Sequence, residues 1–296
     1  MPIIKSQSLY SIVLVVAGFL IYSLADTFVK LLSAGYHISQ IVFTNGFLTI
    51  LLLGGYGVYK RDWSAFQTNH WFLHGVRGIL AVLLNLFNVF ALARISLTDF
   101  YVCVFTAPFW VVLFSALLLK DRIGKHQLLA IGLGFLTIVF MMRPGSGLFS
   151  IGAFAILLGA ICFAISMVIL RKMGPNETRY LLILSGAFFQ VLVTIPFLSS
   201  HFIMPDYLGL IMFLGLGLFN VFGNLFVTMG FQSSPDAGTV APYHYTQMIW
   251  GVIIGYLVFG DLPTDTVVMG SAVLAAAGIY LIRMEYKMAR LAALET

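Results

Sequence analysis

The residues of this sequence that could do chemistry include ionisable side chains set within long apolar runs. Asp26 lies in the second half of the run from Leu9 to Leu32, and Lys30 follows four residues later on the same helical face. A charge at membrane depth costs several kcal/mol, so such a residue is a functional candidate by default. Asp26 could receive the amino group of a substrate or a coupling proton. The alternative is a local ion pair in which Lys30 reaches the membrane interface.

A second polar cluster follows Pro242 in a later apolar run. Tyr243, Gln247 and Trp250 share one face of an ideal helix, and His244 is one position away. Pro242 removes a backbone hydrogen bond nearby. An aromatic and amide stripe beside loosened backbone suits an organic substrate with a planar or cationic group, and plain helix packing is the alternative. His244 could couple transport to protons, or it could be a buried neutral histidine in a hydrogen-bond network.

Two further apolar runs carry asparagines. Arg77, Asn85 and Asn88 form one polar edge, and Asn220 and Asn224 are four residues apart on a shared face. Asparagines in lipid either bond neighbouring helices or line a wet cavity. Both interpretations stay open for each residue.

We predict a single cavity lined by these groups and by a comparable stripe that contains Tyr101 and Phe105. The predicted substrate-binding residues are Asp26, Asn85, Asn88, Tyr101, Phe105, Asn220, Asn224, Tyr243, His244, Gln247 and Trp250. Asp26 and His244 are also the candidates for proton coupling. The sequence predicts no catalytic residues, no metal site and no cofactor.

Composition indicates which elements must position these residues. The 296 residues are 60% hydrophobic and 9% charged, with a mean hydropathy of +1.01, which excludes a soluble domain. The apolar runs are long enough to cross a bilayer as helices of about 20 residues. We predict an all-α polytopic membrane protein with helices near 9–32, 38–59, 71–93, 97–119, 126–142, 149–171, 179–198, 207–230, 237–258 and 264–284.

The charge distribution predicts the orientation of these helices. Of the 16 basic residues, thirteen fall on one side of the membrane if the N-terminus is cytoplasmic, which places both termini in the cytoplasm. Because the basic residues lie at helix ends, the net charge of +5 does not indicate a nucleic-acid partner. Cys103 and Cys162 lie inside predicted spans and are interpreted as small buried apolar residues.

An internal duplication runs through the chain. Asn85-Leu86-Phe87 precedes Asp121 by 36 residues, and Asn224-Leu225-Phe226 precedes Asp261 by 37. The loop after the fourth predicted helix is basic and its counterpart after the ninth is acidic, so the two copies lie upside down relative to each other. We predict two inverted five-helix repeats, over residues 1–145 and 146–296. Their interface would hold the binding site.

The order and spacing of several short motifs resemble the drug/metabolite transporter superfamily, in its EamA-type branch. The motifs are Arg77-Gly78, Ala91-Leu92-Ala93, Thr106-Ala107-Pro108-Phe109, Leu119-Lys120-Asp121, Gly132 and Arg143-Pro144-Gly145. The second half departs from the pattern, since Gln247 and Met248 stand where a mid-helix proline is common. The resemblance implies a multi-pass carrier in a bacterial inner membrane, in a family that includes amino-acid exporters and uptake carriers for S-adenosylmethionine or riboflavin.

These observations predict a secondary transporter that moves a small polar or zwitterionic metabolite, such as an amino acid or a nucleoside-like compound, by alternating access. The expected partners are that substrate and the lipid bilayer, and a homodimer stays open. The alternatives are a membrane-embedded enzyme acting on a lipid-linked substrate, for which the sequence has no cluster of His, Asp or Glu, and a channel, which generally has a filter loop or charged ring.

Overall fold

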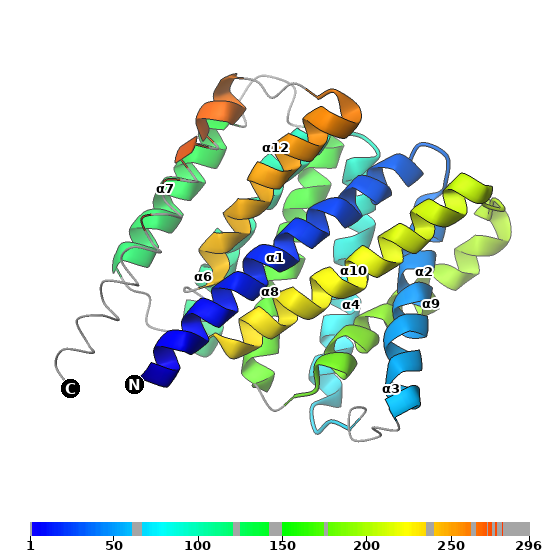
Figure 1. Cartoon of the computed structure of the whole chain (residues 1–296), viewed down its shortest axis with the longest axis horizontal. Coiled ribbons are helices and arrows are strands. Elements are labelled where there is room, and N and C mark those ends of the chain that lie inside the picture. The colour runs from blue at the N-terminus through cyan, green and yellow to red at the C-terminus, as the bar shows by residue number, and fades with distance from the viewer. Residues whose placement is uncertain are drawn as a thin grey trace.

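The computed structural model describes residues 2–60, 67–120, 125–141, 150–174, 177–234, 240–261 and 265–270, with 272, 273, 276 and 280. Every regular element in these ranges is helical (Figure 1). The α-helices are α1 Pro2–Leu32, α2 Ile38–Thr49, α3 Gly55–Lys60, α4 Trp71–Leu92, α5 Leu97–Val104, α6 Ala107–Phe114, α7 Lys125–Met141, α8 Ile151–Met173, α9 Arg179–His201, α10 Tyr207–Ser233 and α12 Thr246–Phe259. The short elements are two π-helical turns, η1 Ile50–Gly54 and η3 Ser115–Leu119, and one 3-10 turn, η4 Ala241–Tyr245.

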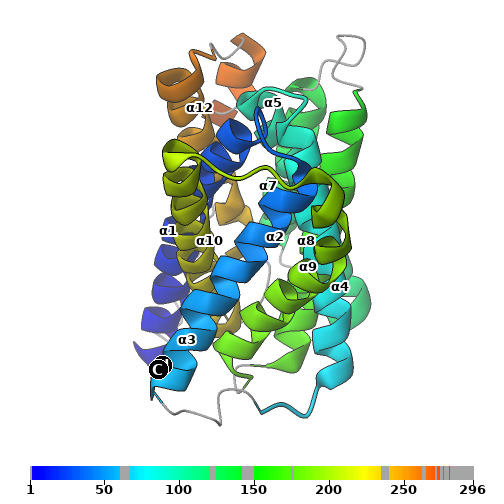
Figure 2. The same cartoon turned by 90° about the vertical axis from the view of Figure 1, so that its right-hand side faces the viewer.

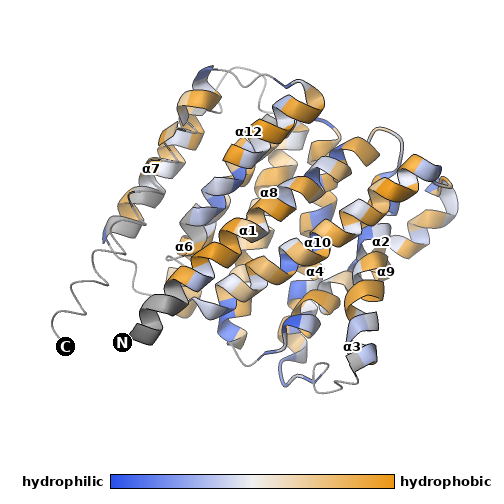
Figure 3. Cartoon of the chain, viewed as in Figure 1, coloured by the Kyte–Doolittle hydropathy of each residue, from blue (hydrophilic) through white to orange (hydrophobic). Residues whose placement is uncertain are grey.

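The prediction of an all-α polytopic membrane protein is confirmed. Within the described residues, seven helices are long and apolar enough to cross a membrane. Large apolar side chains point outward along them, for example Tyr59 and Phe72, each 81% exposed, and Figure 3 shows hydrophobic residues distributed along the helices. Exposure on this scale suits lipid and not water. The predicted helix over 264–284 and the repeat boundary at 145 lie largely outside the described residues.

Three predicted spans are not uniform α-helices, and one of them, at 237–258, contains the 3-10 turn η4 in its described part. The span at 38–59 passes through a π-helical turn, η1, between α2 and α3. The span at 97–119 is divided into α5 and α6. Pro108 explains the division, because it stands at the start of α6 and has no N–H to donate to the carbonyl of Val104, the last residue of α5.

Helices α1 and α10 run antiparallel and pack closely along their lengths (Figure 1). Glycines allow this approach: a Cβ on Gly18 would lie 2.9 Å from the backbone nitrogen of Val227, and a Cβ on Gly223 would lie 3.0 Å from the Tyr22 ring. Small residues are the usual means by which membrane helices approach each other. One helix from each predicted half is thereby joined to the other. We call the end of the bundle where α1 begins the inner end, following the predicted orientation, and the opposite end the outer end.

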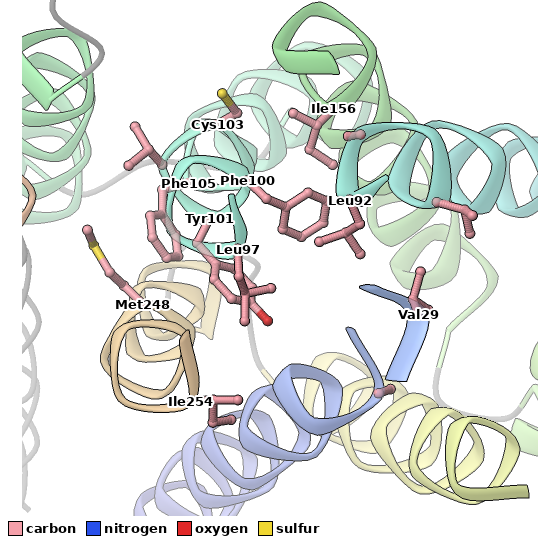
Figure 4. Packing of buried hydrophobic residues seen from close by; sticks show 14 of the residues in the cluster. Val29, Leu92, Leu97, Phe100, Tyr101, Cys103, Phe105, Ile156, Met248 and Ile254 are labelled. Atoms are coloured by element: carbon pink, nitrogen blue, oxygen red, sulfur yellow. The ribbon is translucent and has the colours of Figure 1, made fainter. Parts of the chain in front are cut away.

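A buried aromatic cluster lies on the other side of α1, between α5 and α12. Tyr101 and Phe105 are at most 1% exposed and pack with Met248 of α12 (Figure 4). A Cβ on Gly251 would collide with the Tyr101 ring. Gly251 of α12 therefore allows a close contact with an aromatic side chain. This cluster fixes the position of the Tyr101 hydroxyl.

The α1–α10 contact yields a stability prediction. Gly18→Ala places a methyl group against the Val227 backbone and should lower the free energy of unfolding by roughly 1–3 kcal/mol. Gly75→Ala is the matched control: no atom lies within 4 Å of its added Cβ, so the better helix propensity of alanine should leave stability unchanged or raised. Thermal unfolding of the purified variants in one detergent measures both. Equal melting temperatures for the two variants would contradict the assigned contact.

Candidate substrate cavity

A cavity of about 140 Å³ lies in the middle of the bundle, lined by helices from both predicted halves. Figure 2 shows the arrangement, with α1 and α10 on one side, α4 and α8 on the other, and α2 and α9 between them. Seven of the eleven predicted binding residues line it: Asp26, Asn85, Asn88, Asn220, Asn224, His244 and Gln247.

Asp26 is held at the cavity by two side chains from other helices. The Tyr101 hydroxyl donates to Asp26 Oδ2 at 3.0 Å, and Gln247 Nε2 donates to the same oxygen at 3.2 Å. Neither bond uses Oδ1. Lys30 is directed elsewhere, because its Nζ donates to the Ile95 carbonyl at 2.8 Å. The predicted Asp26–Lys30 pair is therefore not formed, and among the described residues no cation lies within 4 Å of the Asp26 carboxylate.

His244 extends this network. Its Nε2 lies 3.0 Å from Gln247 Oε1, and since an amide oxygen only accepts, His244 donates from Nε2. The ring stacks on Phe19 with centroids 4.0 Å apart and planes 5° from parallel. Asp26, Gln247 and His244 therefore form one hydrogen-bonded chain between α1 and the start of α12.

The predicted stripe of Tyr243, Gln247 and Trp250 is wrong in register. Residues 241–245 form the 3-10 turn η4, which advances about 120° per residue where the prediction assumed 100°. His244 and Gln247, three residues apart, consequently share the cavity face. Tyr243 packs in an apolar cluster with Phe19 and does not line the cavity, and Trp250 packs against the cluster around Tyr101.

Tyr101 and Phe105 contribute without lining the cavity. Tyr101 acts through its bond to Asp26. Phe105 packs edge-on against His244, with ring centroids 6.3 Å apart. The predicted aromatic stripe on this helix therefore supports residues at the cavity instead of forming its wall.

The asparagines line the cavity, and two of them bond within their own helices. Asn224 Nδ2 donates to Asn220 Oδ1 at 2.9 Å, and Asn85 Nδ2 donates to the Ala81 carbonyl at 2.9 Å. Asn88 Oδ1 is buried and accepts no hydrogen bond from the described residues. A buried acceptor without a donor is costly, so Asn88 is suited to accept an N–H or O–H from a ligand or water.

The cavity lining includes polar residues that are absent from the predicted set, and Asn45, Gln190 and Arg77 are three of them. Asn45 Nδ2 donates to Gln190 Oε1 at 3.2 Å, which joins α2 to α9. Asn45 and Gln190 lie in different apolar helices, and no sequence spacing links them. Arg77 is the third: the sequence showed it on the polar edge with Asn85, but its position near a helix end assigned it to membrane topology.

The family profile described as the EamA-like transporter family matches this chain twice, over residues 9–143 and 150–284. The chain belongs to the EamA-like transporter family. This confirms the resemblance drawn from the motifs and identifies the protein as a member of a family of membrane transporters.

Proteins similar to this chain include transporters of different substrates. The S-adenosylmethionine uptake transporter of Rickettsia prowazekii is 25% identical, over 90% of each chain. The pseudopaline exporter CntI of Pseudomonas aeruginosa is 29% identical, over 92% of this chain and 95% of that protein. A solved structure titled only as a protein crystal structure superposes with a TM-score of 0.69 at 14% identity, over 95% of this chain, and supports the fold alone.

At the inner end of this transporter, a polar cluster joins the two predicted halves. His74 Nε2 of α4 pairs with Glu177 Oε1 at 3.1 Å, and both side chains are buried. Gln232 Nε2, at the end of α10, donates to the Glu177 carbonyl at 3.0 Å. We call His74, Glu177 and Gln232 the inner latch.

The outer end is joined by a different set of contacts. Gln40 of α2 both donates to and accepts from the backbone of Ile203, at 2.7 and 2.9 Å. The Tyr36 hydroxyl donates to Asp206 Oδ1 at 3.4 Å. We call these four residues the outer latch. The two latches occupy corresponding positions in the two predicted halves. In each latch, the loop that precedes a helix of one half bonds to the start of a helix in the other half.

The Tyr101 hydroxyl provides a test of the network around Asp26. Tyr101→Phe removes a donor to a partly buried carboxylate and should destabilise the protein by about 1–3 kcal/mol. Tyr245→Phe is the matched control, because the Tyr245 hydroxyl is buried and bonds to no described residue, so its loss should cost nothing. Thermal unfolding in detergent compares the two. A larger loss for Tyr245→Phe would show that the Asp26 network is wrongly assigned.

Proposed function

We propose that this protein is a secondary transporter of the bacterial inner membrane that moves a small polar or zwitterionic organic metabolite. The central observation is the Asp26 carboxylate, fixed at a cavity between the two halves with one oxygen uncommitted. A carboxylate away from water needs a compensating cation or proton. The substrate's cationic group, or a coupling proton, supplies it during transport.

The transport cycle we propose is alternating access by two inverted repeats. The twofold match of the family profile supports two related halves. The inner and outer latches support a cycle in which one end opens while the other stays closed, because each contains a bond between the halves: His74 to Glu177 at the inner end, and Gln40 to Ile203 and Tyr36 to Asp206 at the outer end. Opening either end requires breaking the polar contacts of its latch, and water can replace those contacts.

The relatives guide the choice of substrates to test. One of them is named as an uptake transporter of S-adenosylmethionine. This compound joins an amino acid to a nucleoside, and the cavity lining has residues suited to both parts. Asp26 suits an amino or sulfonium group, and the stacked pair of Phe19 and His244 suits a planar ring. An amino acid or nucleoside-like metabolite is therefore the substrate class that we propose.

Asp26→Asn tests this proposal. The variant keeps the shape of the side chain but removes its charge, so uptake should fall at least tenfold. Asp265→Asn, the same change at an exposed residue, should transport like the unaltered protein. The measurement is uptake of labelled S-adenosylmethionine, amino acids and nucleosides into proteoliposomes. Unchanged uptake and affinity in Asp26→Asn would exclude Asp26 from the binding site.

The latches predict opposite shifts in accessibility. Glu177→Gln removes the charge that pairs with His74 and should favour opening at the inner end. Asp206→Asn weakens the bond from Tyr36 and should favour opening at the outer end. The readout is thiol labelling of Asn85→Cys from either side of the membrane, in a chain whose Cys103 and Cys162 are replaced by alanine. Labelling that changes equally from both sides in both variants would contradict alternating access.

A further inference from the structure

Arg77 is a buried cation at the cavity whose described partners are all neutral. Its side chain lines the cavity, and the residue is 7% exposed. Nε donates to Ser166 Oγ at 3.2 Å, and Nη1 donates to the Leu182 carbonyl at 3.1 Å. No carboxylate of the described residues lies within 4 Å of the guanidinium.

The unused donors of Arg77 have a definite geometry. A guanidinium carries five N–H groups in a planar fork, and two of them make the bonds to Ser166 and Leu182. These bonds hold the plane of the group from α8 and α9. The remaining donors suit a carboxylate, which accepts two parallel hydrogen bonds from such a fork. An anion here would also compensate a charge that is otherwise costly to bury.

Arg77 and Asp26 lie toward opposite ends of the cavity. Phe19 of α1 and Phe163 of α8 both pack on the His244 ring, with centroids 4.0 and 5.2 Å away, and mark one level of the bundle. Asp26 is seven residues beyond Phe19, about 10 Å toward the outer end at the rise of a helix. Helix α8 runs the other way, so Ser166, the partner of Arg77, lies on the inner side of this level.

The direction of α8 follows from contacts at its first turn. Lys30, near the outer end of α1, bonds to the Ile95 carbonyl. A Cβ on Gly152, at the start of α8, would lie 3.1 Å from the side chain of Ile95. The start of α8 is thus at the outer end and Ser166 lies deeper. The charges of Asp26 and Arg77 are separated along the membrane normal by on the order of 10 Å.

We propose that Arg77 binds a carboxylate of the substrate while Asp26 faces its cationic group, so that the substrate is an elongated zwitterion. The two charges of this substrate are several bonds apart, unlike the adjacent charges of a simple α-amino acid. Asn85 and Asn88, which lie between Arg77 and the outer end on α4, contact the segment that joins them. This inference rests on the proposed transport function and narrows its substrate class.

A series of ω-amino acids measures the charge spacing directly. The probes are glycine, 4-aminobutanoate, 6-aminohexanoate and 8-aminooctanoate, with hexylamine and hexanoate as partners of 6-aminohexanoate that lack one charge. Binding to the purified full chain is measured by thermal stabilisation and calorimetry. We expect the longer zwitterions to bind at least tenfold more tightly than glycine, and both single-charge probes to bind at least tenfold more weakly than 6-aminohexanoate. Equal binding of hexylamine and 6-aminohexanoate would overturn the proposal.

Variants of the chain identify the residue that binds the carboxylate of the probe. Arg77→Gln should abolish the preference for 6-aminohexanoate over hexylamine, and Arg77→Lys should retain part of it. Arg94→Gln is the control, because Arg94, in the turn after α4, is exposed and bonds to the Phe90 carbonyl of that helix. If Arg77→Gln retains the full preference, Arg77 is not the carboxylate site. If Arg77→Gln does not fold, the comparison of probes on the unaltered chain still decides the outcome.

The transport assay separates this inference from the function on which it rests. Saturable uptake of any labelled metabolite that Asp26→Asn abolishes, together with no preference for a carboxylate, would reject the role of Arg77 and keep the transporter. Absence of saturable uptake across all labelled metabolites would reject both.

Discussion

The close contact between α1 and α10 is the constraint on which the rest of the structure depends. In lipid, burying apolar side chains gives little drive for helices to associate, so close packing must supply it. Glycines at Gly18 and Gly223 allow the two helices to meet along most of their length. Because α1 carries Asp26 and α10 carries Asn220 and Asn224, the same contact sets the width of the cavity.

Around this contact, polar groups are satisfied in chains that cross between helices. Asp26 is bonded to Tyr101 of α5 and to Gln247 of α12, and Gln247 in turn accepts from His244. Each member would be costly if left alone in a dry environment. The network therefore brings together α5, which Pro108 separates from α6, and α12, which follows the 3-10 turn that contains Pro242.

Much of the fold could be predicted from the sequence, because helices in lipid must satisfy their own backbone and so appear as long apolar runs. Asp26 could be predicted for the same reason, as an ionisable residue in such a run. The helical register after Pro242 could not be predicted, since the same residues are compatible with a 3-10 turn and with an α-helix. The Asn45–Gln190 bond was also unpredictable, because it depends on two helices meeting whose residues share no spacing signal. Arg77 could be recognised in the sequence as a basic residue near a helix end. That position alone does not show whether a basic residue only orients the helix in the membrane or lines the cavity.

The bond between Asn45 and Gln190 gives the α2–α9 contact a mechanical meaning. These helices are the second of each proposed half, and Gly46 lets them touch, since its Cβ would lie 2.9 Å from the Ala187 carbonyl. The bond lies between the two ends of the bundle, away from both latches. A rocking motion of the halves displaces groups in proportion to their distance from the pivot, so a contact near the pivot persists in both states. In the alternating-access cycle that we propose, Asn45 and Gln190 act as the fulcrum that holds the halves together, and the contacts at the two ends set the balance between the two open states.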